Sequence, residues 1–309
     1  MPTREAPTRD QIPAKPQPVT THLKNPNSRR PKATEHPSLS FSQEWIDRAI
    51  PPGSSRYYAV LHADSETRNR LKAITALIGI WSGLAFNGPD PEITLRKVDW
   101  WRTELAEESY KHPLTQLLES ALSSNENLGK QLLEVLGGYA DLIQFGSPST
   151  DEANKLFHWS TGAVACLALT GVENTVNNPV ARAGVALSRF RCLRYLPDHV
   201  NARLLCLPLA ALEANGLSPA QLQPGAKDPA LTAYFQQQLQ ALGKEMEATA
   251  AELLRAGPSS RPLYIYLRSQ QRLLEKILNN GADPVSYTHL RAHETEADLV
   301  CRLLLEKKK

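Results

Sequence analysis

Residues 228–255 read DPALTAYFQQQLQALGKEMEATAAELLR and carry a clear helical periodicity. Asp228 followed by Pro229 is typical of the first positions of a helix. Beyond them, side chains suited to a buried face recur at intervals of three and four residues. They are Leu231, Phe235, Leu239, Leu242, Met246, Thr249 and Leu253. This spacing places all of them on one face, so the segment predicts a long amphipathic α-helix.

The same periodicity recurs along most of the chain on either side of this segment. It predicts helices that begin near Asp64 or Ser65, Pro91, His112-Pro113, Gln131, Thr150, Asn178-Pro179 and Leu263. A short extended stretch is expected at 203–207. The sequence contains neither βαβ alternation nor an internal repeat, and no glycine-rich nucleotide-binding loop. We therefore predict an all-α protein with a single large helical domain.

Two apolar segments are predicted to be buried helices. Ala163 to Val172 is almost entirely apolar, which is typical of a central helix. Ala73 to Phe86 is mostly apolar over about 14 residues. A membrane-spanning helix needs roughly 20 residues, so we expect no membrane span.

Composition and charge exclude several functional classes. The chain of 309 residues has a net charge of only +3, and its basic residues are scattered. We therefore expect no binding to nucleic acid. The four cysteines lack the CxxC spacing of zinc sites, and no apolar signal segment follows Met1. These features favour a reducing compartment, and we expect a cytoplasmic protein.

The two ends differ from the rest of the chain. Residues 1–38 hold 8 of the 23 prolines, with seven basic and three acidic residues, and we predict that they are disordered. A transit peptide is an alternative, although the prolines would break its amphipathic helix. An over-extended start codon is another. Residues 285–309 begin VSYTHLRAHET, which back-translates to a sequencing-library adapter, so we interpret them as adapter read-through rather than native protein. Residues 39–284 then form the domain, with 23 basic and 25 acidic residues.

Short motifs across residues 39–284 occur in an order that resembles the squalene/phytoene synthase family. Residues 55–58, Ser-Arg-Tyr-Tyr, are similar to the Ser-x-Tyr-Tyr with which that family opens. Residues 101–105 and 112–113 are similar to its Trp-Arg-x-Glu-Leu motif and its His-Pro pair. Residues 207–216 fit its Leu-Pro-x-x-x-Leu-x-x-x-Gly motif. Together, the order and spacing of these motifs are specific for the fold and not for the activity.

The resemblance implies a helical bundle of the isoprenoid synthase type, whose central cavity holds two prenyl diphosphates. In active members, two aspartate-rich motifs on facing helices bind Mg²⁺, which neutralises the departing diphosphate. The first motif should fall at 82–90, where Ala85 and Phe86 replace the paired carboxylates and Asp90 alone remains. The second should follow Arg194, where residues 195–199 hold one carboxylate and a proline. We therefore expect no metal site and no cofactor, with Mg²⁺ needed only if the protein is active.

The resemblance also supplies candidate substrate-binding residues. They are Tyr57, Tyr58, Arg194, Asp198 and Arg203. Arg194 matches a family arginine directly, whereas Arg203 matches one only if the alignment slips by one residue. Packing would also explain the tyrosines, and a solvated face or salt bridges would explain the arginines, including Arg189 and Arg191.

Five residues have a simpler structural interpretation. Asp198 with His199 is a pair that one cation could use, although such loop pairs are usually solvated. Cys166 and Cys192 lie on apolar helices and are expected to be inert core thiols. Asp141 is either a carboxylate that supports the site from behind or a charge on a helix surface.

These observations favour a non-catalytic relative of the family that binds a prenyl chain, a prenyl diphosphate or a partner protein. Inactive members similar to it serve as assembly factors for respiratory complexes. The alternative is an active prenyltransferase that condenses two prenyl diphosphates head to head, with arginines in place of Mg²⁺. A third possibility is a bundle whose cavity has collapsed and left an interaction surface. Peripheral attachment at the inner membrane is the alternative to a purely cytoplasmic location.

Overall fold

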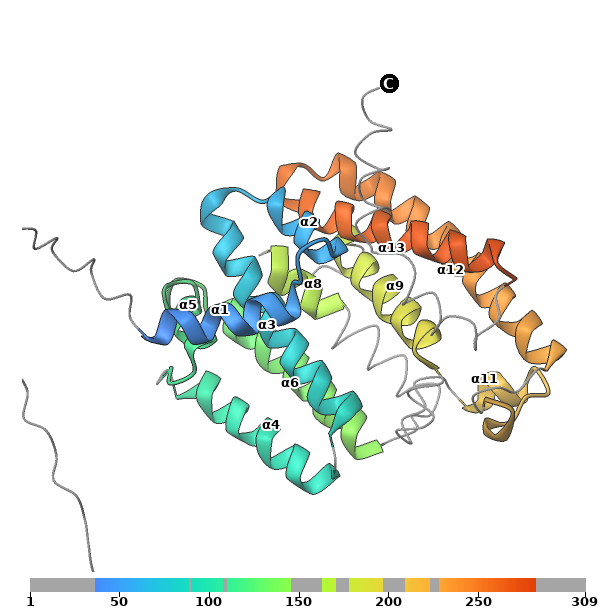
Figure 1. Ribbon diagram of the computed structural model, residues 1–309, viewed down its shortest axis with the longest axis horizontal. Coiled ribbons are helices and arrows are strands. Elements are labelled where there is room, and N and C mark those ends of the chain that lie inside the picture. Colours follow the sequence, from blue (N-terminus) through green and yellow to red (C-terminus); the bar gives the residue numbers. More distant parts are fainter. Residues whose placement is uncertain are drawn as a thin grey trace, which may run out of the picture. The chain divides into compact units, whose positions relative to one another are not determined.

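The computed structural model describes residues 37–88, 90–107, 110–145, 163–170, 178–196, 209–222 and 228–281. All regular elements within these ranges are helices (Figure 1). The α-helices are α1 (Pro37–Ala49), α2 (Ser55–Leu61), α3 (Ser65–Asn87), α4 (Pro91–Ala106), α5 (Pro113–Ser124), α6 (Glu126–Phe145), α8 (Ala163–Thr170), α9 (Pro179–Arg194), α11 (Leu209–Glu213), α12 (Pro229–Arg255) and α13 (Arg261–Asn279). Two 3₁₀ turns, η2 (Pro219–Leu222) and η3 (Pro258–Ser260), complete them. The prediction of an all-α fold is confirmed.

Helix α12 begins and packs as its sequence predicts. The Asp228 side chain accepts a hydrogen bond from the backbone N–H of Ala230 and caps the first turn. The apolar stripe is buried from Leu231 to Leu253 and packs against α9 and α13. A Cβ atom at Gly243 would lie 3.3 Å from Leu274 Cδ2, so glycine permits the close approach of α12 and α13.

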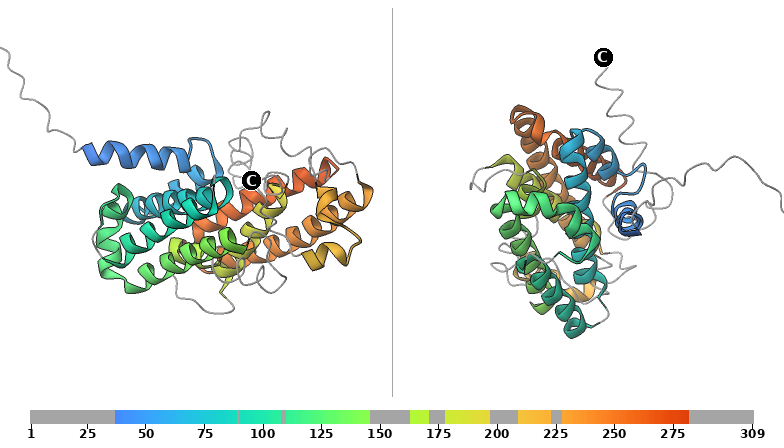
Figure 2. Two further views of the ribbon diagram at one scale, coloured as in Figure 1. Left: turned by 90° about the horizontal axis from the view of Figure 1, so that it is seen from below. Right: turned by 90° about the vertical axis from the view of Figure 1, so that its left-hand side faces the viewer.

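The buried apolar side chains form two main clusters. The first joins α1, α3, α4, α5 and α6, with Trp81, Leu114 and Leu136 fully buried in it. The second joins α9, α12 and α13 around Phe190 and Phe235. Figure 2 shows the blue-to-green helices of the first cluster gathered at one end and the orange-to-red helices of the second at the other. Helix α8 contributes to both clusters, as its apolar sequence predicts.

Helix α2 connects the early and late parts of the chain. It packs against α13, and Gln270 Nε2 of α13 donates a hydrogen bond to Ser55 Oγ at 2.9 Å. A small apolar cluster that includes Ile50, Val60 and Leu71 lies beside it. Through these contacts α2 is held against a helix more than 200 residues later in the sequence.

Glu104 joins α4 to the start of α5. Glu104 is 5% exposed, and its Oε1 accepts hydrogen bonds from the backbone N–H groups of Lys111 and His112 at 2.6 and 2.7 Å. The Thr115 hydroxyl donates a third bond to the same oxygen at 2.6 Å. Because three donors satisfy the charge, this buried carboxylate fixes the turn between the two helices.

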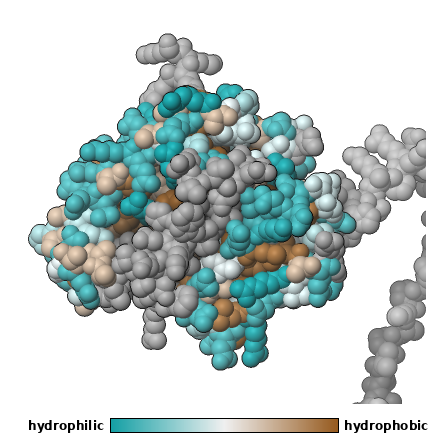
Figure 3. Space-filling view, turned by 180° about the vertical axis from the view of Figure 1, so that it is seen from behind, coloured by the Kyte–Doolittle hydropathy of each residue, from teal (hydrophilic) through white to brown (hydrophobic). Residues whose placement is uncertain are grey.

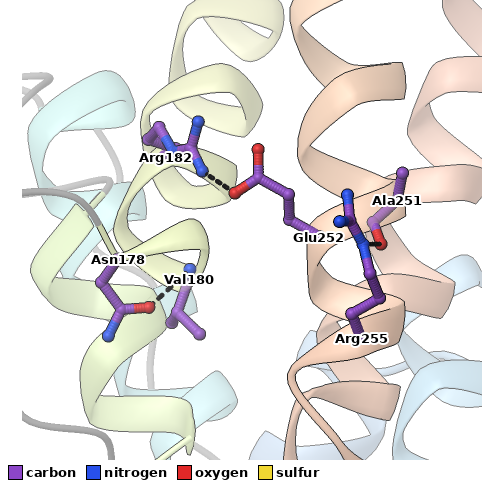
Figure 4. Close-up of polar contacts among 6 residues, drawn as sticks. All are labelled: Asn178, Val180, Arg182, Ala251, Glu252 and Arg255. Atoms are coloured by element: carbon purple, nitrogen blue, oxygen red, sulfur yellow. Dashed lines mark hydrogen bonds and ion pairs between the residues drawn. The ribbon is translucent and has the colours of Figure 1, made fainter.

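Ion pairs link α9 to α12. Figure 4 shows Arg182 paired with Glu252, and Asn178 capping α9 by accepting a hydrogen bond from the Val180 N–H at 2.9 Å. About two turns further along α9, Arg189 Nη1 lies 2.8 Å from Glu245 Oε2. Arg189 therefore acts as a salt-bridge residue between two helices, one of the roles considered for it from the sequence.

Several predicted helix starts are confirmed by their caps. Asp64 accepts from the Thr67 N–H, and His112 Nδ1 accepts from the Leu114 N–H at 3.1 Å. Helix α1 begins at Pro37, inside the segment predicted to be disordered. Residues 1–36 and 282–309, the helix start near Thr150 and the extended stretch at 203–207 lie outside the described residues.

The described surface is largely hydrophilic. Hydrophobic residues reach it in patches between hydrophilic ones on the face shown in Figure 3. Among the described helices, none is long and apolar enough to cross a membrane.

Candidate functional site

A cavity of about 1500 Å³ takes its wall from both halves of the bundle. Helices α1, α2 and α3 contribute to it together with α8, α9 and α13, and Tyr139 reaches it from α6. Its apolar lining includes Ile78, Ile80, Leu84, Leu169, Leu187 and Leu263. Pockets for small ligands typically measure roughly 300–1,000 Å³, so this cavity has room for a long hydrocarbon chain. A cavity of this size between the described helices argues against the collapsed bundle.

Positive charge dominates the described part of the cavity wall. Six arginines line it: Arg48, Arg56, Arg70, Arg191, Arg194 and Arg261. The one carboxylate among the described lining residues is Asp64, and its Oδ1 accepts a hydrogen bond from the Thr67 N–H at 2.7 Å as the cap of α3. The Nε atom of Arg70 is buried and has no hydrogen-bond partner among the described residues. Such a wall favours an anionic ligand.

Arg191 holds a fixed position between α9 and the end of α3. Its Nη2 donates a hydrogen bond to Ser82 Oγ at 2.9 Å, and its guanidinium carbon lies 5.0 Å from the centroid of the Phe86 ring. The second contact is a cation–π interaction, which orients the plane of the guanidinium. Arg191 and Arg194 also occupy the last turn of α9, where the helix dipole favours positive charge.

Tyr139 supplies a buried hydroxyl next to Arg191. Burial raises the pKa of its phenol, while the charges of Arg191 and Arg56 act in the opposite direction. Its hydroxyl shares a hydrogen bond with that of Ser82. The raised pKa keeps the phenol protonated, so the group is a neutral hydrogen-bonding partner in the wall.

Arg56 approaches the same region from α2. Its Nη1 donates a hydrogen bond to the backbone carbonyl of Ala49 at 3.2 Å, and its guanidinium lies 6.0 Å from the Tyr266 ring centroid. The bond between Ser55 and Gln270 fixes the backbone beside it. The guanidinium charges of Arg56 on α2 and Arg191 on α9 therefore both act on the phenol of Tyr139.

The described residues do not fit a magnesium site at the position of the first expected motif. Ala85 is buried, and Phe86 contributes its ring to the cavity wall and to the contact with Arg191. Asp90 caps α4 by accepting hydrogen bonds from the Glu92 and Ile93 N–H groups at 2.8 and 3.2 Å. No group of three His, Cys, Asp or Glu side chains gathers anywhere in the described ranges. Mg²⁺ requires several hard oxygen ligands, which the described residues at this position do not supply.

The structure separates the candidate substrate-binding residues. Arg194 lies in the cavity wall, 5.2 Å from the Tyr195 ring centroid. Tyr57 and Tyr58 stack edge to face on each other and are absent from the described cavity lining, and Tyr57 packs on the small cluster beside α2. Their part in binding stays a prediction. Asp198 and Arg203 lie outside the described residues.

The remaining candidates have structural roles. Cys166 and Cys192 are buried, and burial raises the pKa of the Cys166 thiol to about 12, which leaves it unreactive at neutral pH. Asp141 is an exposed residue on α6, in line with the helix-surface interpretation.

Sequence reasoning missed part of this wall. Arg56 stands inside the Ser-Arg-Tyr-Tyr motif, but the family resemblance points to the tyrosines beside it. The sequence does not mark Tyr139 or Gln270 as cavity residues, because a helical stripe identifies a buried face without saying which other helix packs against it.

A family model described as squalene/phytoene synthase matches residues 51–297. The chain belongs to the squalene/phytoene synthase family. Two crystal structures share its fold. Squalene synthase HpnC from Alicyclobacillus acidocaldarius is 13% identical, with a TM-score of 0.65 and coverage of 80% of this chain and 96% of that one. A dehydrosqualene synthase in complex with a ligand is 14% identical, with a TM-score of 0.69 and coverage of 88% and 99%.

At these identities the two structures support the fold of this family member and leave its activity open. A comparison with curated protein sequences found no match.

Proposed function

We propose that this member of the squalene/phytoene synthase family binds a prenyl diphosphate in its cavity and does not catalyse the Mg²⁺-dependent condensation. The observation that carries the proposal is the composition of the described part of the wall, which holds six arginines and one carboxylate that is engaged as a helix cap. A prenyl diphosphate has a polyanionic head and a long apolar tail. The wall offers guanidinium groups for the first and aliphatic side chains for the second.

Guanidinium groups are well suited to the head of such a ligand. Each presents five N–H donors in a planar fork that matches phosphate oxygens, and its charge persists at all physiological pH values. Bonds between charged partners are about twice as strong as neutral ones. The binding of the head therefore does not depend on a metal ion.

Condensation places a stronger demand on the site than binding does. The diphosphate must depart and leave a carbocation, and in active relatives Mg²⁺ neutralises the departing charge. In this chain the first motif position holds Ala85 and Phe86, and Asp90 is engaged at the start of α4. Loss of these ligands supports a binding role over a catalytic one. Binding of a partner protein by the same bundle remains a prediction from the sequence.

The alternative is an active prenyltransferase in which arginines stabilise the departing diphosphate. The same six arginines favour it, because preorganised positive charge lowers the barrier to formation of an anionic leaving group. Both the non-catalytic proposal and the alternative expect a prenyl diphosphate to bind, and only the alternative expects it to be turned over.

Calorimetric titration and a turnover assay separate them. Farnesyl or geranylgeranyl diphosphate is titrated into the full chain with EDTA and, separately, with Mg²⁺, and diphosphate release is followed in parallel. Binding in both buffers without release is expected. Release that requires Mg²⁺ would overturn the non-catalytic proposal, release in EDTA would establish the alternative, and absence of binding would exclude both.

A further inference from the structure

We propose that Arg191 and Arg56, with the hydroxyls of Ser82 and Tyr139, form a metal-independent site for a diphosphate group. The proposal deepens the proposed function, on which it rests, by naming the residues that bind the head of the ligand. In this proposal Arg191 faces the end of α3, the position where Ala85 and Phe86 replace the carboxylates of the first expected aspartate-rich motif.

The geometry of Arg191 leaves it available to a ligand. Of its five N–H donors, the bond to Ser82 uses one, and the Phe86 ring occupies one face of the guanidinium without using a donor. Within the described ranges no carboxylate forms an ion pair with it. Arg189, two residues earlier on the same helix, contrasts with it, because Glu245 neutralises that side chain. Of these two arginines, the one that lines the cavity is the one that pairs with no carboxylate of the described residues.

Arg56 adds a second positive charge from a different helix. Arg56, Arg191 and Tyr139 all line the cavity, and both guanidinium charges oppose the rise in the Tyr139 pKa that burial causes. Two guanidinium groups and two hydroxyls match a ligand with several charged oxygens better than they match a monovalent anion. A phosphate or diphosphate group is the chemical class that such a set of donors recognises.

The described wall keeps carboxylates away from this point. Asp64, at the opposite end of α3, precedes Ser82 by 18 residues, which is about 27 Å along an α-helix. A cation drawn to Asp64 would therefore lie far from Arg191. Positive charge at the Ser82 end is supplied by fixed guanidinium groups, and excess Mg²⁺ would compete with them for the anion.

Inorganic pyrophosphate is the probe, because it has the head group without a prenyl tail. It is titrated calorimetrically into the full chain in EDTA, and then in excess Mg²⁺. We expect binding in EDTA and several-fold weaker binding in Mg²⁺, since the metal complex of pyrophosphate carries less negative charge. Binding that appears only in Mg²⁺ would overturn the proposal without any variant.

Arg191→Met tests the residue itself, and Arg189→Met is the matched control on the same helix. We expect about a tenfold or greater loss of pyrophosphate affinity for Arg191→Met and less than a twofold change for Arg189→Met. Arg191→Lys keeps the charge but not the planar set of guanidinium N–H donors, so we expect an intermediate loss of pyrophosphate affinity. Circular dichroism verifies the fold of each variant. Affinity for Arg191→Met equal to that of the wild type would refute the assignment.

Farnesyl diphosphate, titrated into the same proteins, separates this inference from the proposed function. If pyrophosphate binding requires Arg191 but the prenyl tail adds no affinity, the head site stands and the prenyl ligand is wrong. If farnesyl diphosphate binds equally well to wild type and to Arg191→Met, the prenyl ligand stands and the head site is wrong.

Discussion

Gln270 of α13 donates a hydrogen bond to Ser55 of α2, over 2.9 Å and between two buried side chains of the cavity wall. The two residues are 215 positions apart in the chain. Ser55 directly precedes Arg56, so this bond fixes the segment that carries one arginine of the cavity. A late helix thereby determines the position of an early functional residue.

Replacement of this glutamine should destabilise the protein. Gln270→Met removes the donor and retains the bulk of the side chain, so we expect the free energy of unfolding to fall by about 1–2 kcal/mol. Urea denaturation followed by circular dichroism measures it. Gln237→Met, at an exposed position on α12, is the control and should change stability little. Equal losses in both variants would show that the bond to Ser55 contributes nothing specific.

Removal of the Glu104 carboxylate should be more costly. Glu104→Ala leaves three donors without their acceptor at the turn between α4 and α5, and we expect a loss of about 3 kcal/mol. Thermal and urea unfolding measure it. Glu119→Ala removes an exposed carboxylate from α5 and should leave stability within about 0.5 kcal/mol of the wild type. A near-neutral Glu104→Ala would contradict the role assigned to this residue.

Gly88, which follows α3, has no space for a side chain. A Cβ atom there would lie 2.6 Å from the Leu84 carbonyl oxygen and would collide with Thr94 Oγ1, which is itself bonded to the Asp90 carbonyl. Gly88→Ala should therefore cost about 1–3 kcal/mol. Gly137, inside α6, has open space around its Cβ position, so Gly137→Ala should stabilise the helix by about 0.5–1 kcal/mol. Chemical denaturation of the two variants compares them, and effects of the same sign would count against this explanation.

His112 should make stability depend on pH. Burial lowers its pKa, although the Glu104 charge acts in the opposite direction, and its Nδ1 must be unprotonated to cap α5. In the unfolded chain the pKa is about 6.5. As the pH falls through that value, the unfolded state takes up a proton that the folded state resists, so the free energy of unfolding decreases.

His112→Asn provides the test, because asparagine also caps helices but does not titrate. Between pH 7.5 and 5.5 the wild type should lose more stability than the variant, as measured by urea denaturation at each pH. Parallel pH profiles would indicate that the cap contributes nothing to the pH dependence. Carboxylates titrate in both proteins, so their contribution to the pH dependence of stability cancels when the two proteins are compared.

The sequence by itself determined the fold class and most helix starts. The residue pairs at 112–113, 178–179 and 228–229 each mark a cap followed by proline, and the structure begins a helix at each. Such signals are local, because a cap and a period of three and four residues involve neighbours within one or two turns. The order of short motifs likewise indicated the family without any knowledge of contacts.

Only the tertiary structure decided which side chains share the cavity. Arg189 and Arg191 are equivalent in the sequence, yet one pairs with Glu245 on α12 and the other meets Ser82 and Phe86 on α3. The family motif points to Tyr57 and Tyr58 and not to Arg56, yet Arg56 is the one of the three that lines the cavity. Two residues apart on a helix point in directions about 200° apart, and what lies in each direction depends on the packing of distant helices. That packing arises from apolar burial over the whole bundle, which no single stretch of sequence encodes.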